Sequence, residues 1–240
     1  MAPRHLVIDS SGGNEIKSAE YENEFFTLIE SPPSSIYRAM NDALTVISSQ
    51  SFNDYFVVFL NSGDVFDSHT LLEDLSKKIR PKDTWIYTSY RTYDPATDTS
   101  RVIHPQGNTL IKQLYARNPI NHQSIFIHSS ALLEVGRFDE TYRVAADWDY
   151  ITRLRTIFEG RFVDMVSTKF VLGGFSSLNR KLGNEELFRL RKAYLPDTFY
   201  HSFQSTLFFY YRKVRLHIYT IFFEKRPKQL RLLRKLMGWR

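Results

Sequence analysis

The feature that most constrains the fold is one apolar run, residues 55–60 (Tyr-Phe-Val-Val-Phe-Leu), which ends abruptly in Asn61-Ser62-Gly63-Asp64. A short, continuous run of aromatic and β-branched residues is typical of a strand buried on both faces of a parallel sheet. Ligands of open α/β sheets bind beyond the carboxyl ends of such strands. Asp64 is the first carboxylate after the run, so its position suits a divalent cation on a phosphate-bearing substrate. The alternative is that Asn61, Gly63 and Asp64 only form a turn.

Hydrophobic periodicity divides the rest of the first half into alternating elements. We predict strands at residues 5–9, 25–30, 84–90 and 101–104, the last two pairing as a hairpin, and amphipathic helices at 35–48 and 71–79. Thr70 and Glu73 have the spacing of a capping box at the start of the second helix. Strands that alternate with helices in this way favour a parallel, doubly wound sheet.

The second half contains another candidate carboxylate. Trp148, Ile151, Leu154 and Phe158 share one face of a predicted helix, which places Asp147 in its first turn. The positive end of a helix dipole favours the ionised carboxylate, the form that a general base needs. The alternative is an ordinary N-cap aspartate. Around this helix we predict strands at residues 124–128, 162–166 and 169–172, and a flexible loop that begins at Gly173-Gly174.

Charge is concentrated at the end of the chain. The 240 residues carry a formal charge of +6 and include no cysteine, so no disulfide framework exists and a reducing cytosol is compatible. From Arg189 onward there are 13 Lys and Arg against 2 acids, which gives +11, whereas the preceding residues sum to −5. We therefore predict a globular domain at 1–188, with halves at about 1–105 and 106–188, and a basic, aromatic-rich helical tail at 189–240.

The tail has the pattern of helices that lie on a membrane surface. One apolar stripe comprises Leu207, Phe208, Tyr211, Val214, Ile218 and Ile221, and a second comprises Leu230, Leu233 and Met237. Cations lie off both stripes, which suits a helix in the interface of an anionic membrane. No uncharged apolar run reaches the roughly 20 residues of a spanning helix. The alternative is a helix pair packed on the domain with a solvated basic face. Nucleic acid is not expected, because the aromatic residues do not interleave with the cations.

Several motifs, in order, resemble glycosyltransferase family 2, in its bacterial exopolysaccharide (colanic-acid-type) branch. The turn at 7–13 (Val-Ile-Asp-Ser-Ser-Gly-Gly) is similar to the family's "VVDGGSTDGT", residues 36–41 (Ile-Tyr-Arg-Ala-Met-Asn) to "GIYDAMN", and residues 59–64 to "FLNSGD". Further along, His122-Gln123 is similar to the "HQ" pair, residues 138–142 to "FDExY", residues 146–150 to "xDxDL", and residues 173–176 to "GGxS". Each motif is weak alone, and the ordered set over about residues 5–180 is specific.

The resemblance implies an α/β, GT-A-like, doubly wound mixed sheet flanked by helices, with a donor half and an acceptor half. It implies that Asp64 binds Mg²⁺ or Mn²⁺ on a nucleotide-diphosphate sugar, and that Asp147 deprotonates a saccharide or lipid-linked acceptor. Asp9, Asn41 and Asn61 would line the donor site. The acceptor side would be lined by His122, Gln123, Asp149, Gly173 and Gly174. The setting would be surface polysaccharide synthesis, on the cytoplasmic face of the plasma membrane.

The sequence departs from the family at three points. The usual D-x-D loop keeps one carboxylate, Asp64, so a cation would be held mainly by phosphate and water, which suits Mg²⁺. The acidic residues and the glycine that precede the family's "IYDAMN" are replaced by Ser and Pro at 31–35, which bears on donor-sugar recognition. The family's first strand-loop-helix unit has no counterpart before His5, and we expect it upstream of Met1. Two other functions are therefore kept: a non-catalytic, transferase-like scaffold or binding protein, and a nucleotidyltransferase.

Overall fold

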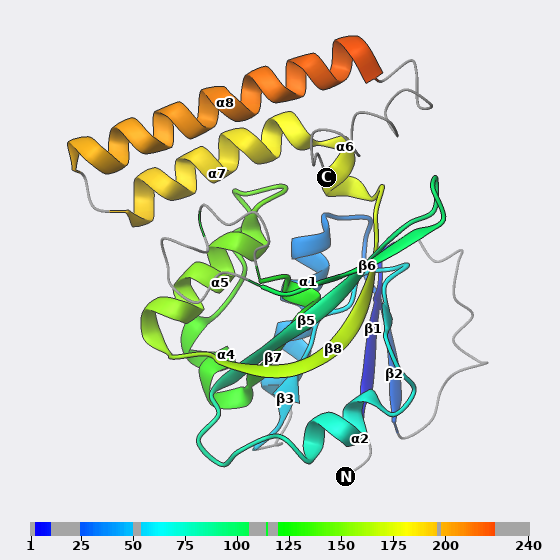
Figure 1. Ribbon diagram of the computed structural model, residues 1–240. Helices are drawn as coiled ribbons and strands as arrows, with labels where there is room; N and C mark the ends of the chain where they lie inside the picture. Colours follow the sequence, from blue (N-terminus) through cyan, green and yellow to red (C-terminus); the bar gives the residue numbers. More distant parts are fainter. Residues whose placement is uncertain are drawn as a thin grey trace. The chain divides into compact units, whose positions relative to one another are not determined.

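The structure is a computed structural model that describes residues 3–10, 25–49, 54–105, 114, 120–195 and 198–223. It divides into two compact units, Met1–Gly174 and Phe175–Arg240, which are described separately (Figure 1). The first unit comprises β1 (His5–Asp9), β2 (Phe26–Glu30), α1 (Ile36–Ser49), β3 (Phe56–Val57), β4 (Val65–Phe66), α2 (Leu71–Ser76), β5 (Trp85–Asp94), β6 (Thr99–Ile103), η2 (His122–Ser124), β7 (Ile125–His128), α4 (Ser129–Val135), α5 (Ala146–Ile157) and β8 (Arg161–Val171).

The main sheet of this unit is mixed and is built around β5, which runs beside β8 through its middle (Figure 1). The strand order is β3-β7-β5-β8-β4, and β6 pairs with β5 as the predicted hairpin. The β5–β8 pairing is parallel, whereas β3–β7, β5–β7, β5–β6 and β4–β8 are antiparallel. β1 and β2 form a separate parallel pair. The expectation of a wholly parallel sheet was therefore wrong, and the mixed sheet implied by the resemblance is confirmed.

The apolar run at 55–60 is not a strand buried at the centre of the sheet. β3 is limited to Phe56 and Val57, lies at the end of the sheet and pairs only with β7 among the described strands. The run is apolar because its alternate side chains serve two different clusters. Phe56 and Val58 pack against a core cluster beneath α2 (Leu71, Leu75, Ile86, Phe126 and Val163), whereas Phe59 packs edge-on against Phe138 with ring centroids 5.4 Å apart.

Two other local predictions were wrong for identifiable reasons. Thr70 does not form a capping box, because its backbone (φ −93°, ψ 2°) is outside the extended conformation that an N-cap adopts, and its hydroxyl donates to Asp74 instead. The strands predicted at 162–166 and 169–172 are one strand, β8. An irregular register between β5 and β8 at Thr88–Tyr90 interrupts the alternation that sequence patterning relies on.

A stack of aromatic rings joins α1 and α5 on the side of the unit that carries the candidate site. Phe138 lies between Tyr37 of α1, at 5.9 Å, and Tyr150 of α5, at 4.3 Å between ring centroids. All three side chains are buried. Since α1 also packs against β1, this stack fixes two helices that each supply a polar side chain to the site.

The second unit comprises α6 (Phe175–Leu178), α7 (Arg180–Tyr194) and α8 (Phe199–Phe223). α7 and α8 pack along one another through Phe188 and Phe209, whose ring centroids are 4.8 Å apart, and through Arg191, which lies over the ring of Phe208. No described helix has both the length and the apolarity needed to cross a bilayer. The part of the predicted turn at 7–13 that follows Ser10, and the second tail stripe at 230–237, lie outside the described residues.

Candidate active site

The turn at 61–64 follows the apolar run and presents two of the predicted residues. Asp64 donates its backbone N–H to the carbonyl of Asn61 at 3.0 Å, which closes the turn. Gly63 has φ +89°, a backbone conformation that costs little only for glycine. The alternative prediction, that these residues form a turn, is thus confirmed for the backbone. The side chains of Asn61 and Asp64 make further contacts.

The carboxylate of Asp64 is held by two elements from distant parts of the sequence. Its Oδ1 accepts the backbone N–H of Val171 at 3.0 Å, and its Oδ2 accepts the side-chain Nε2–H of Gln123 at 2.6 Å. Burial raises the pKa of Asp64, and these two hydrogen bonds and the nearby His122 act in the opposite direction. The carboxylate is therefore oriented, and partial burial makes a positive ligand more favourable there than at a solvated aspartate.

A divalent cation fits this carboxylate only if most of its ligands come from elsewhere. Within the described part of the chain, no group of three or more His, Cys, Asp or Glu side chains is gathered to hold a metal ion. Both Asp64 oxygens already accept one hydrogen bond, and each oxygen keeps further acceptor capacity. The donor set thus fits an ion such as Mg²⁺ that keeps waters and binds substrate phosphates through one carboxylate.

The second carboxylate, Asp147, is in the first turn of α5 as predicted. Its Oδ1 accepts the backbone N–H of Trp148 at 2.9 Å and lies 3.2 Å from the hydroxyl of Tyr37. That hydroxyl is also 2.8 Å from the carbonyl of Val144. The other oxygen, Oδ2, is 3.1 Å from Nδ1 of His122. Asp147 is not the N-cap, since Ala145 precedes the helix without a side-chain cap.

His122 and Gln123 link the two carboxylates because they are adjacent in the single turn η2. Asn121 caps this turn by accepting the backbone N–H of Gln123 at 3.2 Å. From this turn His122 reaches Asp147, whereas Gln123 reaches Asp64, and Gln123 is completely buried. His122 Nε2 also lies 3.3 Å from Nδ2 of Asn61. Five of the predicted residues thus form one connected network: Asn61, Asp64, His122, Gln123 and Asp147.

Asn41 lies outside this network and ties α1 to the loop before α5. Its Oδ1 accepts the N–H of Phe138 at 2.8 Å, and its Nδ2 donates to the Phe138 carbonyl at 3.0 Å and to Glu140 Oε1 at 2.8 Å. Only 1% of the residue is exposed. These contacts indicate that Asn41 stabilises the fold. Its predicted role in the donor site stays a prediction.

Asp149 is also buried, and it pairs with an arginine of its own helix. Its Oδ2 pairs with Nε of Arg153 at 2.8 Å, one helical turn further along α5. The same guanidinium donates to the carbonyls of Val135 and Arg137, at 2.6 and 2.8 Å. This arrangement anchors α5 to the end of α4, and it differs from the position of Asp147, whose carboxylate meets the network described above.

The remaining predicted residues lie at element ends. Asp9 is the buried last residue of β1, opposite Glu30 of β2 in the register. Gly173 has φ +108° in the turn that follows β8, and Gly174 comes next. Because Val171 donates to Asp64, these glycines are two and three residues beyond a direct contact with the candidate metal ligand.

Sequence reasoning did not select Tyr37 and Asn121 as site residues. Tyr37 lies one helical turn before Asn41 in the motif at 36–41, so a signal for it was present. Asn121 precedes the His-Gln pair as a potential cap for a short turn. The partners of Tyr37 lie far away in the sequence, and the role of Asn121 depends on the conformation of the turn. A single sequence shows neither.

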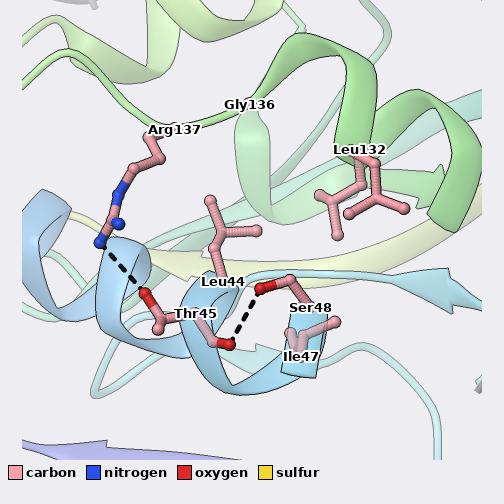
Figure 2. A pocket seen from close by; sticks show the side chains of 8 residues that line it. Leu44, Thr45, Ile47, Ser48, Leu132, Gly136 and Arg137 are labelled. Carbon is pink, nitrogen blue, oxygen red and sulfur yellow. Dashed lines mark hydrogen bonds between the residues drawn. The ribbon is translucent and has the colours of Figure 1, made fainter. Parts of the chain in front are cut away.

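A separate cavity of about 240 Å³ lies between α1 and α4 (Figure 2). It is lined by Leu44, Thr45, Ile47, Ser48, Leu132, Leu133, Gly136 and Arg137. Arg137 is its charged lining residue, and the guanidinium already donates to the Asn41 carbonyl and to Thr45 Oγ1. The cavity contains no predicted site residue and no carboxylate, so the chemistry is better placed in the network around His122.

Comparison with known proteins supports the fold and finds similarity to proteins described as glycosyltransferases. No protein family model matches the chain. Proteins described as uncharacterized glycosyltransferases from two strains of Mycobacterium tuberculosis are each 26% identical over 179 residues, which covers 72% of this chain and 65% of theirs. The chain thus spans about two thirds of the length of these curated relatives.

The structure is similar to a crystal structure of S. aureus TarS, residues 1–349. The TM-score is 0.57 at 14% sequence identity, and the match covers 94% of this chain and 66% of that one. At this identity the match bears on the fold. Taken together, the chain is GT-A-like in fold and similar in sequence to proteins described as glycosyltransferases.

Proposed function

We propose that this protein is an inverting glycosyltransferase. It would transfer a sugar from a nucleotide-diphosphate donor to a saccharide or lipid-linked acceptor in surface polysaccharide synthesis. The single observation that carries the proposal is the joining of Asp64 and Asp147 through the adjacent residues Gln123 and His122. Two oriented carboxylates, one suited to a cation and one suited to a proton, are the minimum that such a transfer requires.

The residues would divide the reaction as follows. Asp147 accepts the proton of the acceptor hydroxyl as that oxygen forms a bond to the anomeric carbon. The bond from that carbon to the diphosphate oxygen breaks on the opposite face, and the nucleoside diphosphate leaves with the bonding electrons. Asp64 would hold Mg²⁺ or Mn²⁺, which supplies charge neutralisation for the leaving diphosphate. Asn61 belongs to the same turn, so its amide would lie on the donor side.

The predicted basic tail gives the proposal a location. In α8 the exposed large apolar side chains fall at helical spacing: Phe203, Leu207, Tyr210, Tyr211 and Val214. Lys213 and Arg215 flank Val214, one on each side of this stripe, because successive helical residues are about 100° apart. An apolar stripe with cations along its edges fits an anionic membrane interface. We propose that the protein associates peripherally with the cytoplasmic face of the plasma membrane through this surface.

The test of the transferase proposal is product analysis with a panel of nucleotide-diphosphate sugars. The purified chain is incubated with each donor, with a saccharide or lipid-linked acceptor, and with Mg²⁺ or Mn²⁺. Release of nucleoside diphosphate that depends on the acceptor supports the proposal. A parallel incubation contains nucleoside triphosphates and sugar 1-phosphates in place of the donor, and pyrophosphate released there identifies a nucleotidyltransferase instead. Donor binding without any release identifies a non-catalytic scaffold.

A further inference from the structure

An unbroken series of side-chain hydrogen bonds runs from the 61–64 turn to α1. It passes from Asn61 Nδ2 to His122 Nε2 (3.3 Å), from His122 Nδ1 to Asp147 Oδ2 (3.1 Å), and from Asp147 Oδ1 to the Tyr37 hydroxyl (3.2 Å). The four histidine and aspartate atoms in the middle belong to partly buried groups, with 13% of the His122 side chain and 18% of the Asp147 side chain exposed. His122 is therefore held from both ring nitrogens.

The two contacts fix which ring nitrogen carries the proton. A carboxylate oxygen can only accept a hydrogen bond, so Nδ1 of His122 donates to Asp147. The amide nitrogen of Asn61 can only donate, so Nε2 of His122 accepts. The neutral imidazole with hydrogen on Nδ1 satisfies both contacts at once. Asn61 thus selects the tautomer that presents a donor to the candidate base.

We propose that His122 is a positioning residue, which orients the Asp147 carboxylate and couples it through Asn61 to the turn that carries Asp64. This inference rests on the proposed function, because it assigns a role toward the base of that reaction. Asn61 and Asp64 are joined within one turn by a 3.0 Å backbone hydrogen bond. A displacement of that turn when donor and cation bind would be transmitted to His122 and then to Asp147.

The surroundings of His122 suit a positioning role. Its backbone is fixed in η2 by the cap from Asn121, and its neighbour Gln123 is completely buried and bonded to Asp64. A base that is held by a rigid supporting group loses less orientational freedom when the acceptor binds. Asp147 itself receives hydrogen bonds on both oxygens, so removing the His122 contact leaves Oδ2 free to rotate away from the acceptor.

Two substitutions at one position separate the two halves of this arrangement. His122→Asn places an amide near the position of Nδ1, where it can still donate to Asp147, and it loses the contact with Asn61. His122→Gln places an amide near the position of Nε2, where it can still contact Asn61, and it loses the hydrogen bond to Asp147. We expect His122→Gln to lower kcat about 10- to 100-fold, the usual effect of losing the partner that orients a functional side chain.

We expect the Asn variant to keep a kcat about tenfold higher than the Gln variant, with donor KM similar in the two. If the role of His122 were purely structural, both variants would instead show lower thermal stability, a higher donor KM and a lower kcat, all to a similar extent. Equal kcat in the two variants, or a higher kcat in His122→Gln, would overturn the proposal. Asn61→Ala completes the set, and it should lower kcat without changing the stability of the fold.

A second readout does not depend on activity or on the folding of any variant. In the wild-type protein with ¹⁵N-labelled histidine, the imidazole of His122 should carry its proton on Nδ1 and not on Nε2, at neutral pH. A proton on Nε2 would contradict the hydrogen-bond assignment and the proposal with it. If the tautomer is as expected but the wild type releases no nucleoside diphosphate, the proposed function fails while the geometry around His122 stands.

Discussion

Asn41→Ala distinguishes a residue that holds the fold from one that binds the donor. The substitution removes three hydrogen bonds, two with Phe138 and one with Glu140, and it leaves the Phe138 N–H buried without its acceptor. At a net value of about 1 kcal/mol for each bond, the free energy of unfolding should fall by about 3 kcal/mol. For a unit of this size that corresponds to a fall in Tm of about 6–12 °C.

The assay is thermal unfolding followed by circular dichroism, with donor affinity measured on the same preparations. Ser48→Ala is the matched control, because Ser48 is on the same helix, is exposed and bonds only to the Thr45 carbonyl in its own helix. That variant should stay within about 0.5 kcal/mol of the wild type. If Asn41→Ala melts like the control while its donor affinity falls strongly, the reasoning is refuted and the residue belongs to the donor pocket.

Three further predictions concern charge. Arg161 lowers the pKa of Asp83 through their ion pair. The pair therefore stabilises the fold above the ordinary Asp pKa of about 3.9, and this stability is lost as the pH falls through the lower folded-state value. Asp83→Asn should destabilise the protein by about 1.5–3 kcal/mol at pH 7, and by progressively less in urea melts as the pH falls below about 3.9. Asp64→Ala should remove the dependence of donor affinity on Mg²⁺ in calorimetric titrations, and a metal dependence that survives would reduce Asp64 to a turn residue. Lys213→Glu should weaken co-sedimentation with anionic vesicles by about 2 kcal/mol, since it changes two charges at about 1 kcal/mol each, whereas the matched reversal Lys78→Glu should not; equal behaviour of the two would withdraw the membrane surface.

Local sequence patterns predicted which segments form helices and strands better than they predicted which segments pack beside one another. The strands at β1 and β2, the hairpin of β5 and β6, and the helices α1 and α5 all follow from periodicity. The position of β3 does not follow from periodicity. An apolar run indicates that both faces of a segment are covered, but it does not indicate which elements cover them. Phe56 contacts one cluster and Phe59 another, which gives the composition of a central strand to a two-residue strand at the sheet end.

The same limit applies to the site. The carboxylates and the His-Gln pair could be chosen from the sequence, since their residue types and order carry the chemistry. What the sequence did not distinguish is that Asn41 and Asp149 turn inward to Phe138 and Arg153, whereas Asp147 meets His122. All are polar residues at helical positions, and their partners lie in other elements. Only the packing of α1 and α5 around Phe138 separates these cases.

Asp147 is the proposed base, and one measurement tests this role directly. Nucleoside diphosphate release is followed for the wild type and Asp147→Asn with the same donor, acceptor and cation, after circular dichroism has shown equal folding. Since Asn keeps the shape of the side chain but cannot take the proton, turnover should fall about 10²–10⁴-fold while donor affinity is retained. Turnover in Asp147→Asn equal to that of the wild type would contradict the assignment of this residue as the base.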